Sequence, residues 1–161
     1  MRAVFKDGGK VTAGNASQLS DGAAAVLVAS REAADKNGWD VLATVLDYCT
    51  SGVEPARVMA APIPAIEMLL QRNHLTMDDL VYVEHNEAFA AASCAIAKAC
   101  NIPDEKFNPH GGAVAIGHPL GATGARCLMT LINALRRTGG GKGIVTLCLG
   151  GGNAVAMLVD A

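Results

Sequence analysis

With 161 residues, of which 51% are apolar and only 17% are charged, the chain has the length and composition of one domain with a sizeable core. Its net charge of −2 excludes the strongly basic surface of a nucleic-acid-binding protein, and no block of like charge marks an interaction tail.

Targeting and redox signals are also sparse. No apolar run approaches the roughly 18 residues of a membrane-spanning helix. The first residues, MRAVFKDGGK, lack the apolar stretch of a signal peptide. The five cysteines include no CxxC pair, which argues against a disulfide framework or a zinc site and favours a reducing compartment. We therefore expect a cytoplasmic protein that holds no metal.

The first predicted elements are a loop, a strand and a short helix. Residues 1–14 form a loop with no element before it, so we expect the chain to be the later part of a longer protein. A buried strand is predicted near residues 24–28. Ser30 then caps a helix that ends at Gly38, a residue that commonly terminates helices.

Strands and helices continue to alternate through the middle of the chain. Residues 41–49 are predicted as a strand, and two prolines begin a helix over residues 62–73. Thr76, with Asp79 three residues later, has the spacing of a capping box. Another strand is predicted over residues 80–85.

The last elements complete an α/β pattern. Residues 88–100 are predicted as an almost wholly buried helix, because Lys98 is their only charge. A longer helix precedes Gly139, and two strands joined by a short glycine turn follow it, so we expect that pair to be antiparallel. Strands alternating with helices predict an α/β fold, with a mixed β-sheet and helices on both faces.

The segment NEAF, Asn86 to Phe89, is the first candidate for chemistry. It lies where a predicted strand ends and a helix begins, and open α/β sheets bind ligands at such positions. Asn86 equally fits the role of an N-cap, and taken alone the segment favours that structural interpretation.

The segment GGAVAIGHPLGATGAR contains the second candidate, His118. Gly117 and Pro119 hold this imidazole on a rigid turn just before a helix, where it tends to stay neutral, as a base must. The glycines imitate a phosphate-binding loop, but their spacing is not GxGxxG after a strand. The other three histidines fit surface or packing roles better.

Cys148 is the third candidate. It lies near the end of a strand-like apolar run that leads into Gly150 to Gly152, where the backbone is least encumbered. A thiol can exchange protons near neutrality, and free N–H groups in the glycine turn can point at a developing oxyanion. The alternative is an ordinary buried cysteine, which is the interpretation we apply to the other four.

The segment TAGNASQLSDG, residues 12–22, offers small residues and hydroxyls that could admit a narrow ligand. Helix capping by Ser17 or Ser20 explains the same residues, so this segment decides nothing alone.

Taken together, four segments resemble in order and spacing the C-terminal half of a thiolase, an acyl-CoA C-acetyltransferase: VTAGNASQLSDGAAAV, NEAFAA, GGAVAIGHPLGATGAR and CLGGGNAVAM. The resemblance covers the chain from about Phe5 to Val159. It implies a thiolase-like half-fold in which residues 1–161 form the C-terminal domain. The active site would lie where this domain meets an N-terminal half.

The resemblance also implies a role for each candidate residue. His118 corresponds to the histidine that activates the nucleophilic cysteine, and with Asn86, through a water, it forms one oxyanion hole. Cys148 corresponds to the cysteine that exchanges a proton with the acetyl carbon or the leaving group, and the N–H of Gly150 helps to form a second oxyanion hole. Abstracting a proton beside a thioester needs such a base and such donors. The residues implied to bind CoA and substrate are Ala13, Gly14, Ser17, Phe89 and Met59.

One part of the family pattern is missing from the chain. The nucleophilic cysteine of thiolases belongs to the N-terminal half, and none of the five cysteines here has its context. The resemblance therefore implies an acyltransferase of fatty acid metabolism that is active only with such a half, as a hetero- or homo-oligomer. Its substrates would be acyl-CoA and CoA, with no cofactor.

Two alternatives stay open at this point. The chain could be a non-catalytic partner that binds and stabilises a thiolase. It could also be a related decarboxylating or condensing enzyme on the same fold, although CxGGG after GHP favours a thiolase.

Overall fold

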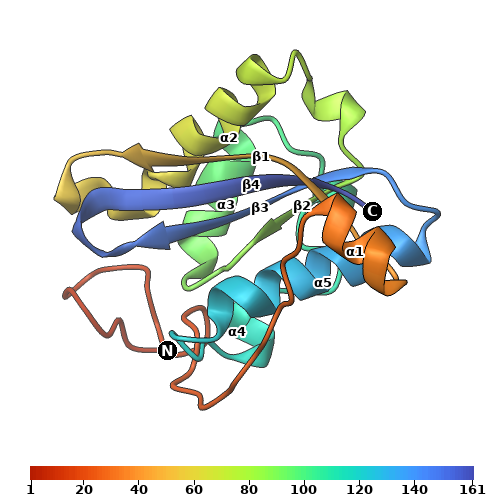
Figure 1. The fold of residues 1–161 in the computed structure, drawn as a ribbon. Coiled ribbons are helices and arrows are strands. Elements are labelled where there is room, and N and C mark those ends of the chain that lie inside the picture. The colour runs from red at the N-terminus through yellow and green to blue at the C-terminus, as the bar shows by residue number, and fades with distance from the viewer.

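The computed structural model describes all 161 residues and contains one four-stranded sheet (Figure 1). The strands are β1 (Thr44–Gly52), β2 (Tyr82–His85), β3 (Lys142–Leu149) and β4 (Asn153–Asp160). The α-helices are α1 (Arg31–Asn37), α2 (Pro62–Arg72), α3 (Ala90–Ala99), α4 (Ala113–Ile116) and α5 (Thr123–Arg137). The 3₁₀ helices are η1 (Pro55–Ala60), η2 (Met77–Asp79), η3 (Asp104–Lys106) and η4 (Gly150–Gly152). None of these helices has both the length and the apolar character needed to span a lipid bilayer.

The sheet is mixed, as the sequence predicts. Its strand order is β1-β4-β3-β2, with β2 and β3 parallel and the other two pairs antiparallel. The last strand of the chain, β4, therefore lies between β1 and β3. The parallel pair sends the carboxyl ends of β2 and β3 to the same edge of the sheet, which positions the candidate site.

Two apolar cores hold helices against the two faces of the sheet. α2 and α3 cover one face and α5 covers the other, on opposite sides of the strands in Figure 1. Each fully buried aliphatic side chain contributes about 1.5–3 kcal/mol relative to an exposed one. The largest helix side chains in these cores are Ile66 and Leu69 of α2, Ile96 of α3, and Leu131 and Leu135 of α5.

The predicted local signals are present. Ser30 accepts a hydrogen bond from the backbone N–H of Ala33 at 3.1 Å, and Gly38 ends α1 with φ of 65°. The backbone N–H of Thr76 donates to the carboxylate of Asp79 at 2.7 Å, which completes the predicted capping box. These contacts are local, and residue spacing alone was enough to predict them.

Two predictions about burial are wrong for this chain. Residues 24–28 form no strand, and Leu27 and Val28 are 76% and 77% exposed. The reason is that no neighbouring strand pairs with them. Helix α3 is buried on one face only, and Ala91, Cys94 and Ala95 are exposed on the other. Both segments have the apolar sequence of a core, but nothing in the chain covers them.

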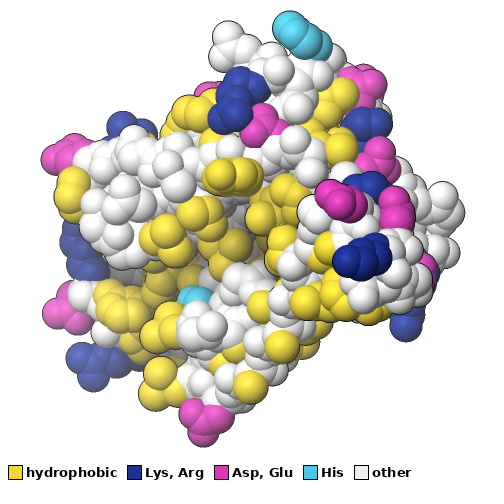
Figure 2. Space-filling view, in the orientation of Figure 1, with side chains coloured by type: hydrophobic (Ala, Val, Ile, Leu, Met, Phe, Trp, Pro, Cys, Tyr) yellow, Lys and Arg dark blue, Asp and Glu magenta, His cyan; other side chains and the backbone are white.

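The edge strand β1 adds to this uncovered apolar surface. Leu46 is 43% exposed and Tyr48 is 70% exposed on this strand. Figure 2 shows hydrophobic side chains gathered around a hollow on the face where the β1–β4 side of the sheet lies above the N-terminal part of the chain. Contiguous exposed apolar surface of this kind marks an interaction site or an aggregation risk.

Candidate functional site

The candidate site lies at the carboxyl edge of the parallel strands. Asn86 directly follows β2, and its backbone N–H donates to the carbonyl of Thr146 in β3 at 3.2 Å. Cys148 lies two residues further along β3. Asn86 and Cys148 therefore lie at the same edge of the sheet, and the turn between α4 and α5 brings His118 to this edge.

A chain of hydrogen bonds passes through the side chain of His118. Its Nε2 lies 3.1 Å from Nδ2 of Asn86, and its Nδ1 lies 2.7 Å from the hydroxyl of Thr123. That hydroxyl donates its single proton to the carbonyl of Pro119 at 2.8 Å, so it accepts a hydrogen bond from Nδ1–H of His118. The lone pair of Nε2 is then free to accept from the amide of Asn86.

The surroundings keep this imidazole neutral. Burial lowers the pKa of His118, and the positive charge of Arg126 lowers it further. In the neutral ring Nε2 carries no proton, which is the state that a general base requires near pH 7.

The capping alternatives raised by the sequence do not hold. The N-cap of α3 is Phe89, with no side-chain cap, and the side chain of Asn86 instead contacts His118 and Arg126. Ser17 caps no helix, because the chain stays irregular until α1. The backbone N–H of Ser17 donates to the carbonyl of Ala88 at 2.9 Å, which joins residues 12–17 to the segment after β2.

Cys148 is half-buried beside a second sulfur atom. Its Sγ lies 3.8 Å from Sδ of Met59 in η1. Burial raises the pKa of the Cys148 thiol, so the group carries its proton at neutral pH and is ready to act as an acid. The next residues form the glycine turn η4, in which Gly151 and Gly152 have φ of 79° and 90° and Gly150 is exposed.

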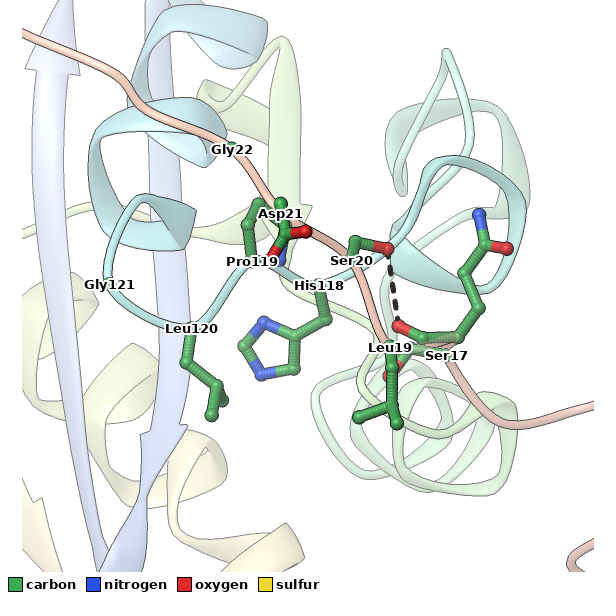
Figure 3. A pocket seen from close by; sticks show the side chains of 10 residues that line it. Ser17, Leu19, Ser20, Asp21, Gly22, His118, Pro119, Leu120 and Gly121 are labelled. Carbon is green, nitrogen blue, oxygen red and sulfur yellow. Dashed lines mark hydrogen bonds between the residues drawn. The ribbon is translucent and has the colours of Figure 1, made fainter.

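Two pockets flank these residues. The first, of about 570 Å³, lies between residues 17–22 and the turn of residues 118–121, and contains Ser17 and His118 (Figure 3). The second, of about 420 Å³, is almost entirely apolar and is lined by Met59 and Phe89, among others. Met59 links this pocket to Cys148, which itself lines neither pocket. Ala13 and Gly14 are exposed and line neither pocket.

Three residues of the site were not singled out by the sequence analysis. Arg126 donates to Oδ1 of Asn86 at 2.9 Å and to Glu84 at 3.3 Å, and Thr123 holds His118. Glu84 is fully buried, and burial raises its pKa to about 8 although Arg126 opposes the shift. One sequence signal pointed to this pair: a carboxylate inside the apolar strand VYVEH needs a buried partner.

His85 provides a stability prediction. It is fully buried beneath Ser93, and burial lowers its pKa to about 4, below the 6.5 of an exposed histidine. Between pH 6.5 and 4 His85 therefore binds a proton in the unfolded chain but not in the folded chain. The neutral side chain stabilises the fold above pH 6.5, and this contribution, about 3 kcal/mol in full, is lost as the pH falls towards 4.

Replacing His85 with glutamine is expected to reduce the loss of stability between pH 7 and pH 5. The measurement is the free energy of unfolding by urea at each pH, in the complete protein. The matched control is His110→Gln, which makes the same replacement at an exposed histidine. Equal pH dependence in His85→Gln and the wild type would refute the assignment.

No three His, Cys, Asp or Glu side chains lie together in a way that could hold a metal ion. Comparison with known families instead matches the thiolase C-terminal domain to residues 39–161. The chain belongs to the thiolase family. The thiolase N-terminal domain matches residues 1–32. The predicted membership of the thiolase family is confirmed, and thiolases are acyltransferases.

Individual thiolases agree with this assignment. Acetyl-CoA acetyltransferase of Syntrophomonas wolfei is 49% identical over 160 residues, covering 98% of this chain and 40% of the relative. The crystal structure of Bacillus anthracis acetyl-CoA acetyltransferase matches with a TM-score of 0.96 at 42% identity, covering 99% of this chain and 41% of that one. Human mitochondrial 3-ketoacyl-CoA thiolase in complex with CoA matches with a TM-score of 0.91 at 36% identity, over 99% and 40% of the two chains.

These matches also show which fold and what length of chain are shared with the known thiolases. The predicted thiolase-like α/β fold with its mixed sheet is confirmed. The chain spans about 40% of the length of the curated relatives that it matches.

Proposed function

We propose that this chain supplies the activating histidine, the oxyanion-hole asparagine and the acid/base cysteine of a thiolase. The complete enzyme would interconvert 3-ketoacyl-CoA plus CoA with acyl-CoA plus acetyl-CoA. The observation that carries the proposal is the contact between the amide of Asn86 and the unprotonated Nε2 of His118. Both residues belong to motifs that the family resemblance singles out.

The contact explains how one pair of side chains serves two steps. In the neutral state the amide of Asn86 donates to Nε2 of His118. When Nε2 takes the proton of a nucleophilic thiol, it becomes a donor itself and no longer accepts from the amide. Two donors then face the same space, where they can bind the negative oxygen that develops on a thioester.

Cys148 fits the proton exchange at carbon. Its protonated thiol lies beside Met59, which together with Phe89 lines the apolar pocket. An acyl chain held in this pocket would place its α-carbon near the sulfur. We assign the second oxyanion hole to the N–H of Gly150, which is exposed and has no heavy atom within 4 Å of the position that a β-carbon would occupy. The pocket of Ser17 and His118 would take the pantetheine arm, with Ala13 and Gly14 nearer its entrance.

We further propose that the nucleophilic cysteine belongs to an N-terminal thiolase half that covers the uncovered apolar surface. Val28, Leu46 and Tyr48 are exposed, and an isolated chain would leave them in water. We therefore expect the functional protein to be an assembly with that half, and to use CoA as a substrate and no cofactor. A cytoplasmic location stays a prediction.

The first test asks whether the chain alone is acylated. Purified chain is incubated with acetyl-CoA and analysed by intact-protein mass spectrometry, alone and together with an N-terminal thiolase half. We expect no acetyl group on the isolated chain, because it lacks the nucleophile, and acetylation of the partner cysteine in the assembly. An acetyl group on any of the five cysteines of this chain would refute the division of roles.

A non-catalytic partner subunit is the second candidate function. The uncovered apolar surface also fits this role, since a scaffold needs an interface and no chemistry. The two candidates differ in the need for Cys148, which the replacement described in the Discussion tests.

A further inference from the structure

We propose that Arg126, anchored by Glu84, is a positioning residue that fixes the orientation of the Asn86 amide, so that Nδ2 and not Oδ1 faces His118. The orientation of the Asn86 amide is inferred from geometry alone. The expected effect of Arg126 on turnover rests on the proposed function.

The guanidinium of Arg126, on α5, joins two buried side chains that lie two residues apart at the end of β2. Its Nη2 donates to Oδ1 of Asn86 at 2.9 Å, and its Nη1 donates to Oε1 of Glu84 at 3.3 Å. Glu84 is fully buried in β2, and the side chain of Arg126 is only 15% exposed in the first turns of α5. The planar fork of an arginine can satisfy both acceptors from one position, which a lysine cannot do.

This contact determines which end of the amide faces His118. Because Oδ1 of Asn86 accepts from Arg126, Nδ2 is left to donate to Nε2 of His118. Turning the amide over would place two donors together at Arg126 and two acceptors together at His118. Arg126 therefore also stabilises the His118 tautomer in which Nδ1 carries the proton, the same tautomer that Thr123 favours from the other side of the ring.

The orientation is needed for the proposed chemistry. Without Arg126 the amide is free to present Oδ1 to His118, which would favour the tautomer with a proton on Nε2. Such a ring cannot accept a proton from the nucleophile, and Asn86 would then direct an acceptor at the developing oxyanion. Arg126 touches neither substrate nor reacting atoms in this scheme, and acts through Asn86.

The test compares three replacements in the assembly of this chain with its N-terminal half: Arg126→Met, Arg126→Lys and Glu84→Gln. We expect Arg126→Met to lower kcat about 100-fold with little change in KM, as for other losses of alignment. Arg126→Lys keeps the charge without the fork and should lose nearly as much. Glu84→Gln keeps an oxygen acceptor at the same place and should retain most activity. Arg136→Met, at an exposed arginine of the same helix, is the control.

A second readout separates orientation from folding and from activity. ¹⁵N NMR of histidine-labelled assembly reports which nitrogen of His118 carries the proton, with a His118→Asn sample to assign the signals. The expected result is Nδ1–H in the wild type and in Glu84→Gln, with Nε2–H gained in Arg126→Met.

An unchanged tautomer in Arg126→Met, or Nε2–H in the wild type, would overturn the inference even if activity falls. If the tautomer changes as expected while the wild-type assembly has no thiolase activity, the positioning role is supported and the proposed function fails.

Discussion

Replacement of Cys148 with alanine is expected to lower the turnover of the complete enzyme by about 10²–10⁴-fold, the range for loss of a general acid or base. The thiol is protonated and half-buried beside Met59 of the apolar pocket, where it can deliver a proton to carbon and recover it. Its hydrogen-bond partner among the side chains is the thioether of Met59, which cannot donate a proton in its place.

The control for this measurement is Cys94→Ala. Cys94 is exposed on the uncovered face of α3, outside both pockets, so association of the two halves is measured together with turnover, and we expect both to stay unchanged. Acylation of the partner cysteine should survive in Cys148→Ala, since that step depends on His118. Full turnover in Cys148→Ala would contradict the enzymatic role and favour the scaffold function.

Replacement of two glycines in the turn η4 is expected to affect stability in one case and catalysis in the other. Gly152 has φ of 90°, and a β-carbon there would meet the carbonyl of Val53 and lie 3.1 Å from the backbone of Pro55. Gly152→Ala is therefore expected to lower the free energy of unfolding by roughly 3 kcal/mol or more, from backbone strain and overpacking. Denaturant unfolding of the complete protein measures this loss.

Gly150→Ala should behave in the opposite way. Nothing lies within 4 Å of the position that its β-carbon would occupy, so the free energy of unfolding should change by less than about 0.5 kcal/mol. The added methyl group would instead crowd an oxygen bound at the N–H of Gly150, and turnover should fall. Full activity in Gly150→Ala would remove this N–H from the proposed oxyanion hole. A stable Gly152→Ala would show that the turn has more room than the structure gives it.

The parts of the fold that the sequence predicted are those set by neighbours along the chain. The cap at Ser30, the stop at Gly38 and the capping box at Thr76 depend on contacts between residues three or four positions apart. Apolar residues at 24–28 and along α3 predicted burial, but an apolar pattern cannot say which surface covers a face. Here residues 24–28 and one face of α3 have no covering surface and remain exposed.

The same distinction between local sequence signals and tertiary packing applies to the candidate site. The motifs brought attention to Asn86 and His118, 32 residues apart, and the structure places their side chains in contact. The sequence did not single out Arg126. A carboxylate inside an apolar strand indicates that Glu84 needs a buried partner, but which residue supplies it, 42 positions later, depends on how α5 packs across β2.

The order of the strands has a consequence for how the chain is made. β1 is joined to the rest of the sheet only through β4, which is made about a hundred residues later. Until β4 leaves the ribosome, β1 has no strand partner, and its exposed edge is open to pairing with other chains. The pairing of β1 with β4 also requires closure of a long loop, which slows folding. The addition of β1 to the sheet is therefore a late step relative to the synthesis of β1 itself.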